Sequence, residues 1–250
     1  MKRTASIVAA CLLMGGVSAV SPAFAGPSAS GGGSATSGYN AIPSKVSGNV
    51  TSEAFQATQT TEFGDAVGLS GKNRTLNSMT VLFSSFACVT GAYELGTCET
   101  TPGATFEVPI TFNVYAADSA GVPGGLITSK TQNETFAYRP SASTQCVGDD
   151  AGKWYNSKDK TCYNGLPQTI TMTMPTGVTL TDNVIWSVKY DTSNTSGVSG
   201  PADSLNVGAF SFPNAPYSGI DLDADQAFRN GVMVGGWTGY RPLGAITTVK

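Results

Sequence analysis

The chain has 250 residues, carries a formal net charge of −3, contains only 12% charged residues and has no histidine. The lack of histidine excludes Ser-His-Asp triads and most metal-dependent hydrolysis, and no basic patch is present that would hold nucleic acid by charge. A length of this size fits one large all-β domain.

Residues 1–25 have the features of a secretory signal peptide. Lys2 and Arg3 are followed by an apolar run from Ala5 to Val20, and Ala23-Phe24-Ala25 fits a small-x-small cleavage site. The run is short and is broken by Gly15 and Gly16, so a retained membrane helix is not expected. We predict that the protein is secreted, extracellular and not membrane-spanning.

An alternative N-terminal processing site needs to be weighed. The segment Val8–Cys11 resembles a bacterial lipobox, in which Cys11 would be acylated. Apolar sequence continues well beyond Cys11, whereas a lipobox should follow the apolar core. Cleavage after Ala25 is therefore the favoured prediction.

The segment after the predicted cleavage site is of low complexity. Residues 26–38, GPSASGGGSATSG, are rich in Gly and Ser and poor in apolar residues. We predict a flexible linker there, followed by a single domain over residues 39–250.

Alternation of apolar and polar residues dominates this domain. An apolar residue occupies every second position in four sets: Val108 to Val114, Met79 to Phe83, Ile170 to Met174, and Val184 to Tyr190. Such a period of two indicates strands with one buried face. Further strands are expected at Ala54–Thr60, Leu126–Tyr138, Leu205–Phe212 and Ala245–Val249.

Turn sequences separate the expected strands, as in Gly121-Val122-Pro123-Gly124-Gly125 between two alternating stretches. No segment offers a helical stripe of apolar residues. The sequence therefore predicts an all-β fold: an antiparallel, jelly-roll-like β-sandwich braced by disulfides.

Four cysteines remain after removal of Cys11: Cys88, Cys98, Cys146 and Cys162. Three pairings are formally open. Proximity in the sequence favours Cys88–Cys98 and Cys146–Cys162. A zinc site is disfavoured because no two cysteines have the close spacing of a zinc motif and histidine is absent.

The stretch CVGDDAGKWYNSKDKTCYNG, residues 146–165, is the best candidate for a ligand site. Trp154, Tyr155, Asn156 and Tyr163 combine flat aromatic faces with amide and hydroxyl groups, which is what a sugar ring needs. The competing interpretation is that the aromatic side chains pack on the disulfide.

A second candidate is the acidic stretch with Asp221, Asp223 and Asp225. Its alternating carboxylates resemble the start of a calcium-hand loop, but that loop needs Gly at its sixth position and Glu at its twelfth, where this chain has Gln226 and Val232. A solvated acidic loop is the favoured interpretation. A looser structural calcium site stays open, and no other cofactor is expected.

Carboxylates could also support glycan cleavage, which requires a pair of acids across a cleft. Four glutamates are available, but none lies in a motif that pairs it with another: Glu94, Glu99, Glu107 and Glu134. No catalytic residue is therefore assigned.

One resemblance covers most of the domain. ITFNVYAADSAGVPGGLITSKTQ looks like a strand-turn-strand unit of secreted bacterial sandwich domains. The chain from YNAIPSKVSGNVTSEAFQATQTTEFGD through YRPSAS and CYNGLPQTITMTMP to SLNVGAFSF is similar to a group of secreted bacterial proteins of unknown function. The resemblance implies a jelly-roll-like sandwich and no particular activity.

Three functions are compatible with these observations. The first is a secreted, non-catalytic extracellular protein with a structural or adhesive role at a surface or in a matrix. The second is a carbohydrate-binding module, and the third is a glycan-cleaving enzyme. The expected partner is an extracellular glycan or a cell surface, not nucleic acid.

Overall fold

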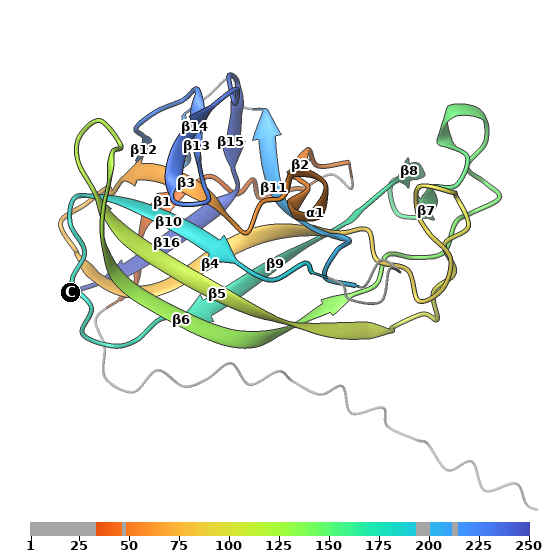
Figure 1. The fold of residues 1–250 in the computed structure, drawn as a ribbon, viewed down its shortest axis with the longest axis horizontal. Coiled ribbons are helices and arrows are strands. Elements are labelled where there is room, and N and C mark those ends of the chain that lie inside the picture. Colours follow the sequence, from red (N-terminus) through yellow and green to blue (C-terminus); the bar gives the residue numbers. More distant parts are fainter. Residues whose placement is uncertain (1–33, 47–48, 194–200, 212–214) are drawn as a thin grey trace, which may run out of the picture. The chain divides into compact units, whose positions relative to one another are not determined.

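The computed structural model describes residues 34–46, 49–193, 201–211 and 215–250 (Figure 1). The predicted signal peptide, Cys11 and most of the predicted linker lie outside these residues. The first strand, β1 (Thr36–Asn40), begins inside the segment predicted to be linker. It does so because Thr36 to Asn40 pair with the strand at the C-terminal end of the chain.

The fold is an antiparallel β-sandwich, as the alternation predicts. Besides β1, the first sheet contains β2 (Ser52–Glu53), β4 (Thr75–Ser85), β9 (Leu166–Thr173), β11 (Leu205–Ser211), β15 (Tyr240–Pro242) and β16 (Gly244–Val249). The second sheet contains β3 (Glu62–Gly68), β5 (Thr105–Ala117), β6 (Pro123–Ala137), β10 (Asn183–Lys189), β12 (Ile220–Asp221), β13 (Gln226–Arg229) and β14 (Val232–Gly235).

The strand order is that of a jelly roll. Four strands of the first sheet are successive neighbours in the order β1, β16, β4, β9. Four strands of the second sheet are successive neighbours in the order β3, β10, β5, β6. Numbered along the chain, these eight strands form sheets of order 1-8-3-6 and 2-7-4-5, the double Greek key of this architecture. The segment between β10 and β16 supplies the extra strands β11 to β15, which extend both sheets.

The alternating residues form the core between the two sheets. The apolar sets of β4, β5, β9 and β10 are buried in one cluster, which includes Trp186 and Phe112. A smaller cluster, which includes Ala66, Ile185 and Phe228, lies on the other face of the second sheet. Strand β10 is consequently buried on both faces.

One expected strand is wrong. Residues within Ala54–Thr60 form the short helix α1 (Phe55–Thr58) instead. Phe55 is fully buried and stacks on Tyr190, with ring centres 4.1 Å apart, while polar side chains on the same turn stay in solvent. A segment with one buried side chain, Phe55, fits a single helical turn better than a strand, which would bury every second residue.

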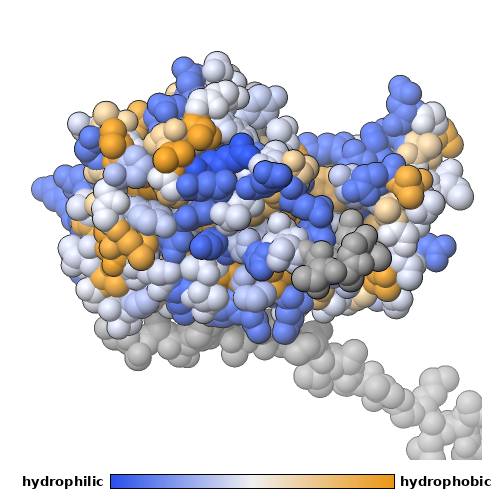
Figure 2. Space-filling view, in the orientation of Figure 1, coloured by the Kyte–Doolittle hydropathy of each residue, from blue (hydrophilic) through white to orange (hydrophobic). Residues whose placement is uncertain are grey.

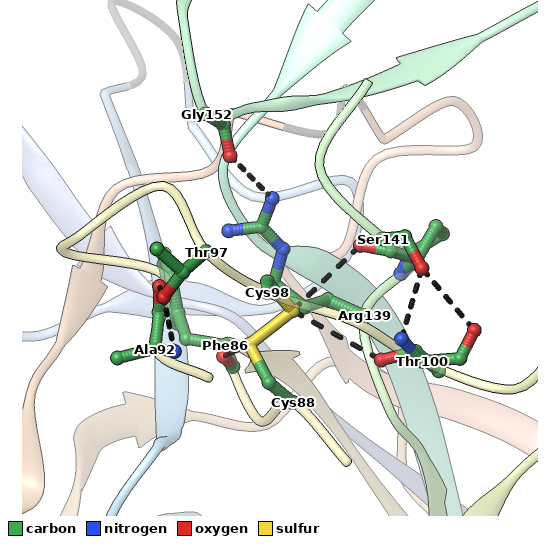
Figure 3. Close-up of a disulfide and its surroundings, with 10 residues drawn as sticks. Phe86, Cys88, Ala92, Thr97, Cys98, Thr100, Arg139, Ser141 and Gly152 are labelled. Carbon is green, nitrogen blue, oxygen red and sulfur yellow. Dashed lines mark hydrogen bonds between the residues drawn. A yellow bond between two sulfur atoms is a disulfide. The ribbon is translucent and has the colours of Figure 1, made fainter. Parts of the chain in front are cut away.

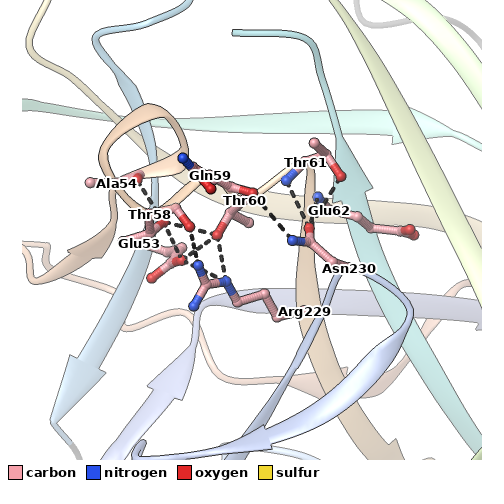
Figure 4. A network of polar contacts seen from close by, with 9 residues as sticks. All are labelled: Glu53, Ala54, Thr58, Gln59, Thr60, Thr61, Glu62, Arg229 and Asn230. Atoms are coloured by element: carbon pink, nitrogen blue, oxygen red, sulfur yellow. Dashed lines mark hydrogen bonds and ion pairs between the residues drawn. The ribbon is translucent and has the colours of Figure 1, made fainter.

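Hydrogen bonds tie this turn to β13 (Figure 4). Glu53 Oε1 accepts from the hydroxyls of Thr58 and Thr60 at 2.8 and 2.5 Å, and Arg229 Nε donates to Thr60 Oγ1 at 2.7 Å. Asn230 Oδ1 also accepts from the backbone N–H of Thr61 at 2.8 Å. The network fixes the segment leading into β3.

Both predicted disulfides are confirmed. Cys88 is bonded to Cys98 and Cys146 to Cys162, with Cα atoms 5.3 and 5.9 Å apart. The second loop contains the 3-10 helix η1 (Gly148–Asp150) and a small hairpin of β7 (Trp154–Asn156) and β8 (Thr161–Tyr163). Figure 1 shows this hairpin beyond one end of the two sheets.

Within the described residues, no helix has the length and apolar character needed to cross a bilayer.

Candidate functional site

The β7–β8 hairpin separates the aromatic residues that the sequence grouped together. Trp154 lies opposite Tyr163, and Tyr155 lies opposite Cys162. Successive residues of a strand point to opposite faces, so Trp154 and Tyr155 cannot form one stacking platform. This part of the sequence-based hypothesis is corrected by the register of the hairpin.

Trp154 and Tyr163 have structural roles. Trp154 is only 8% exposed, its indole Nε1 donates to the carbonyl of Gly165 at 3.0 Å, and its ring centre is 5.3 Å from that of Tyr163. Tyr163 Oη donates to Asp159 Oδ2 at 2.6 Å, and Asn156 Nδ2 donates to the same oxygen at 3.2 Å. Three of the four predicted ligand residues therefore hold the hairpin together.

Tyr155 is placed differently. It is half-buried and lines a groove of about 650 Å³ together with Tyr138, whose ring packs on Phe106 with centres 4.8 Å apart. The other lining residues are four that bear hydroxyls and four that do not: Thr100, Ser141, Ser143 and Thr144, and Pro102, Gly103, Pro140 and Ala142. No charged side chain lines this groove among the described residues. A second groove of about 810 Å³ adjoins it, shares Thr100, Pro102, Ser141 and Ala142, and has Glu99 in its lining.

Residues that line the groove are hydrogen-bonded to both disulfide-closed loops. Ala142 N donates to the carbonyl of Cys98, and Ser143 N donates to that of Lys153, each at 2.9 Å. Ser141 Oγ accepts from Thr100 N at 2.9 Å and donates to Thr100 O at 3.2 Å, as Figure 3 shows beside the Cys88–Cys98 bond. The groove is thus preorganised by covalent and backbone links from two sides.

Arg139 lies between the lining residues Tyr138 and Pro140 in the chain, and sequence reasoning missed it. Its side chain is fully buried beside the Cys88–Cys98 disulfide, and Nη2 donates to the carbonyl of Gly152 at 3.0 Å (Figure 3). Burial lowers the pKa of its guanidinium, against the opposing influence of Tyr93 and Glu94. Arg139 therefore links the segment after β6 to the second disulfide loop.

A second polar centre lies on the outer face of the second sheet. Glu62 is 8% exposed, and its Oε1 accepts from Asn113 Nδ2 at 2.8 Å, Tyr115 Oη at 2.9 Å and Ser187 Oγ at 2.5 Å. Burial and the hydrogen bond to Glu62 raise the pKa of Tyr115 to about 12. An oxygen that accepts three hydrogen bonds stabilises the sheet and is poorly placed to accept a proton from a substrate. Sequence reasoning missed Glu62 because its partners come from two other strands, β5 and β10, that are distant from it in the sequence.

The acidic stretch is reorganised by the fold. Asp221 and Asp223 meet Asp65 of β3, and a carboxylate oxygen of each lies within 4.8 Å of the others. Asp225 is exposed, and its carbonyl accepts from Trp237 N at 3.2 Å. Asp225 is therefore not part of the cluster, and Asp65, distant in the sequence, takes its place.

The three carboxyls differ in their surroundings. Burial, followed by the charges of Asp221 and Asp223, raises the pKa of the Asp65 carboxyl well above its ordinary value. Burial, together with the neighbouring Asp221, raises the pKa of Asp223 to about 7. Arg241 Nε donates to Asp221 Oδ2 at 2.6 Å and so compensates one of the three charges.

On the face drawn in Figure 2, apolar residues form small patches separated by polar ones. No family model, curated protein or solved structure matches the chain.

Proposed function

We propose that the protein is a secreted, non-catalytic extracellular protein with an adhesive role at a surface or in a matrix, and that it adheres by binding a neutral glycan in the groove between its two disulfide-closed loops. The observation that carries this proposal is the pairing of two half-buried tyrosines, Tyr138 and Tyr155, with a lining of hydroxyl groups.

The chemistry of the groove suits a sugar chain. Aromatic faces stack on the apolar C–H faces of a pyranose, and hydroxyl and backbone groups exchange hydrogen bonds with its hydroxyls. The described lining of the Tyr155 groove has no charged group, which favours a neutral sugar there, and Glu99 in the adjoining groove disfavours an acidic one. Because the adjoining groove shares Thr100 and Ser141, a chain of several sugar units is a better fit than a single residue.

The two disulfides support a rigid groove and an extracellular location of the protein. A groove held by Cys88–Cys98 and Cys146–Cys162 loses little conformational entropy on binding, which favours affinity. Disulfides persist in oxidising compartments, in agreement with the signal peptide predicted from residues 1–25. A non-catalytic role is favoured because the buried Glu62 carboxylate is occupied by three donors on one oxygen.

A binding assay on immobilised neutral polysaccharides and a glycan array tests this proposal. Tyr155→Ala should reduce retention at least tenfold, whereas Tyr155→Phe should keep most of it because the ring remains. Tyr240→Ala is a matched control, since Tyr240 is an exposed tyrosine on β15 that does not line the groove. Retention that is unchanged in Tyr155→Ala, or no retention on any neutral glycan, would contradict the proposal.

A further inference from the structure

The acidic cluster forms at an interruption in the pairing of β3. β13 pairs with β3 at Phe63 and Gly64, and β12 pairs with it at Val67 and Gly68. Asp65 lies between these two paired segments. The sheet edge is therefore locally open at the position where a buried carboxylate is found.

Asp65 is directed between the two sheets. It alternates with Phe63 and Val67, which belong to the main core, so its side chain shares their face. Tyr39 of β1, in the opposite sheet, donates its hydroxyl to Asp65 Oδ2 at 3.3 Å. The carboxylate is fully buried, and its other oxygen, Oδ1, has no hydrogen-bond partner among the described residues.

β12 and the segment after it bring the other two carboxylates, Asp221 and Asp223, to the same place. Asp221 lies opposite Val67 in the β12–β3 pair, and Leu222 N donates to the carbonyl of Ala66 at 3.1 Å. This register carries Asp223 to the level of Asp65. Both carboxylate oxygens of Asp223 are shielded from solvent and lack a hydrogen-bond donor among the described residues.

The charges of the cluster are not balanced. Three carboxylates face one guanidinium, that of Arg241, which is bound to Asp221. If all four groups are ionised, two negative charges remain in excess. Burying unpaired like charges is costly unless protons or a cation neutralise them. A shared proton between Asp221 and Asp223 would satisfy only part of this excess and would leave Asp65 Oδ1 without a partner.

A divalent cation would neutralise the two excess negative charges and would coordinate the carboxylate oxygens of Asp65 and Asp223 that lack hydrogen-bond partners. Calcium binds oxygen ligands at about 2.3–2.6 Å, so two oxygens on one calcium ion can be up to about 5 Å apart. The three carboxylate oxygens lie within 4.8 Å of one another. A set of hard oxygen donors, with neither sulfur nor imidazole, selects calcium-type ions over zinc.

We propose that Asp65, Asp221 and Asp223 bind one calcium ion at the edge of β3, between the two sheets. The ion would join β12 and the segment after it to β3, next to the Asp221–Arg241 ion pair that connects β12 to β15 of the other sheet. Its role is structural, because Asp65 is fully buried, Asp221 and Asp223 are half-buried, and the site is distinct from the glycan groove. This inference does not depend on the proposed function.

Calcium titration of the purified protein, stripped with EDTA and exchanged into metal-free buffer, tests the site. CaCl₂ should raise the melting temperature in a concentration-dependent manner, since a ligand that binds only the folded state stabilises it. Isothermal titration calorimetry should give a stoichiometry of one. MgCl₂ should give a smaller shift, because magnesium needs shorter distances and loses its water reluctantly.

Variants separate metal binding from general stability. Asp65→Asn should abolish the calcium-dependent shift and raise the melting temperature in EDTA, because it removes one of the repelling carboxylates. Asp223→Asn is the second variant and should behave in the same way if Asp65→Asn does not fold. Asp225→Asn, two residues away and exposed, should retain the full calcium shift.

The outcomes are decisive in both directions. A shift that is present in the wild-type protein and in Asp225→Asn but lost in Asp65→Asn or Asp223→Asn supports the site. No shift and no binding heat with CaCl₂ would overturn it, as would a shift that survives both cluster variants or is equalled by MgCl₂.

Discussion

Trp154 and Tyr163 lie directly opposite each other in the β7–β8 hairpin, with ring centres 5.3 Å apart and planes inclined by 51°. Both side chains are largely buried, and Trp154 also donates a hydrogen bond to Gly165. Aromatic pairs of this geometry contribute about 0.5–1.5 kcal/mol beyond the burial of their area. The Trp154–Tyr163 pair stabilises one face of the hairpin, and Tyr155, on the opposite face of the hairpin, lines the groove.

Trp154→Ala should therefore lower the stability of the protein. Truncating a large buried aromatic side chain costs about 3–5 kcal/mol. Tyr155→Ala removes a half-buried ring from a groove wall and should cost clearly less. Thermal melts of both variants measure the difference. A larger loss for Tyr155→Ala than for Trp154→Ala would contradict these assignments.

The Cys146–Cys162 bond should contribute measurably to stability. Cysteines separated by 16 residues close a loop for which the chain-entropy model gives about 3 kcal/mol. The double variant Cys146→Ser, Cys162→Ser should lose about this amount in urea denaturation and should weaken glycan retention. Peptide mapping without reduction checks the pairing, and any peptide linking Cys88 to Cys146 or Cys162 would refute it.

Glu62→Ala should destabilise the second sheet strongly. The substitution leaves the donors of Asn113, Tyr115 and Ser187 without their shared acceptor, at about 1–3 kcal/mol for each donor left unsatisfied. Glu62→Gln retains a side-chain oxygen and should cost less. Urea denaturation of the two variants gives the comparison, and equal losses would argue against the network.

The acidic cluster predicts a pH dependence in the presence of EDTA. The folded-state pKa of Asp223, about 7, is above its ordinary value of 3.8, so the folded state binds this proton more tightly than the unfolded state. The corresponding stabilisation is complete below about pH 4 and is lost as the pH rises toward 7. The melting temperature in EDTA should fall between pH 5 and pH 8. Asp223→Asn should flatten this part of the profile, and an equally steep profile in the variant would exclude Asp223 as its source.

The N-terminus of the exported protein provides a further test. If Ala23-Phe24-Ala25 is the cleavage site, intact mass spectrometry of the protein from the culture medium should give a chain starting at Gly26. A chain that starts at an acylated Cys11 and partitions with membranes would instead support the lipobox.

The sequence by itself determined the fold class and the disulfides. Apolar residues at every second position, as from Val108 to Val114, can be buried together only if the segment is extended, so alternation specifies a strand without reference to its neighbours. Cysteine pairing was equally accessible, because residues close in the chain meet at a small entropic cost. Both signals are local.

The tertiary structure alone decided the sites. The register of β7 and β8 sent Trp154 and Tyr155 to opposite faces, and a shift of one residue would have exchanged them. The pairing of β12 with β3 brought Asp65 to Asp221 and Asp223 from far away in the chain, while Asp225 was left in solvent. Such contacts depend on which strands become neighbours, and that is determined by packing across the whole sandwich rather than by any one segment.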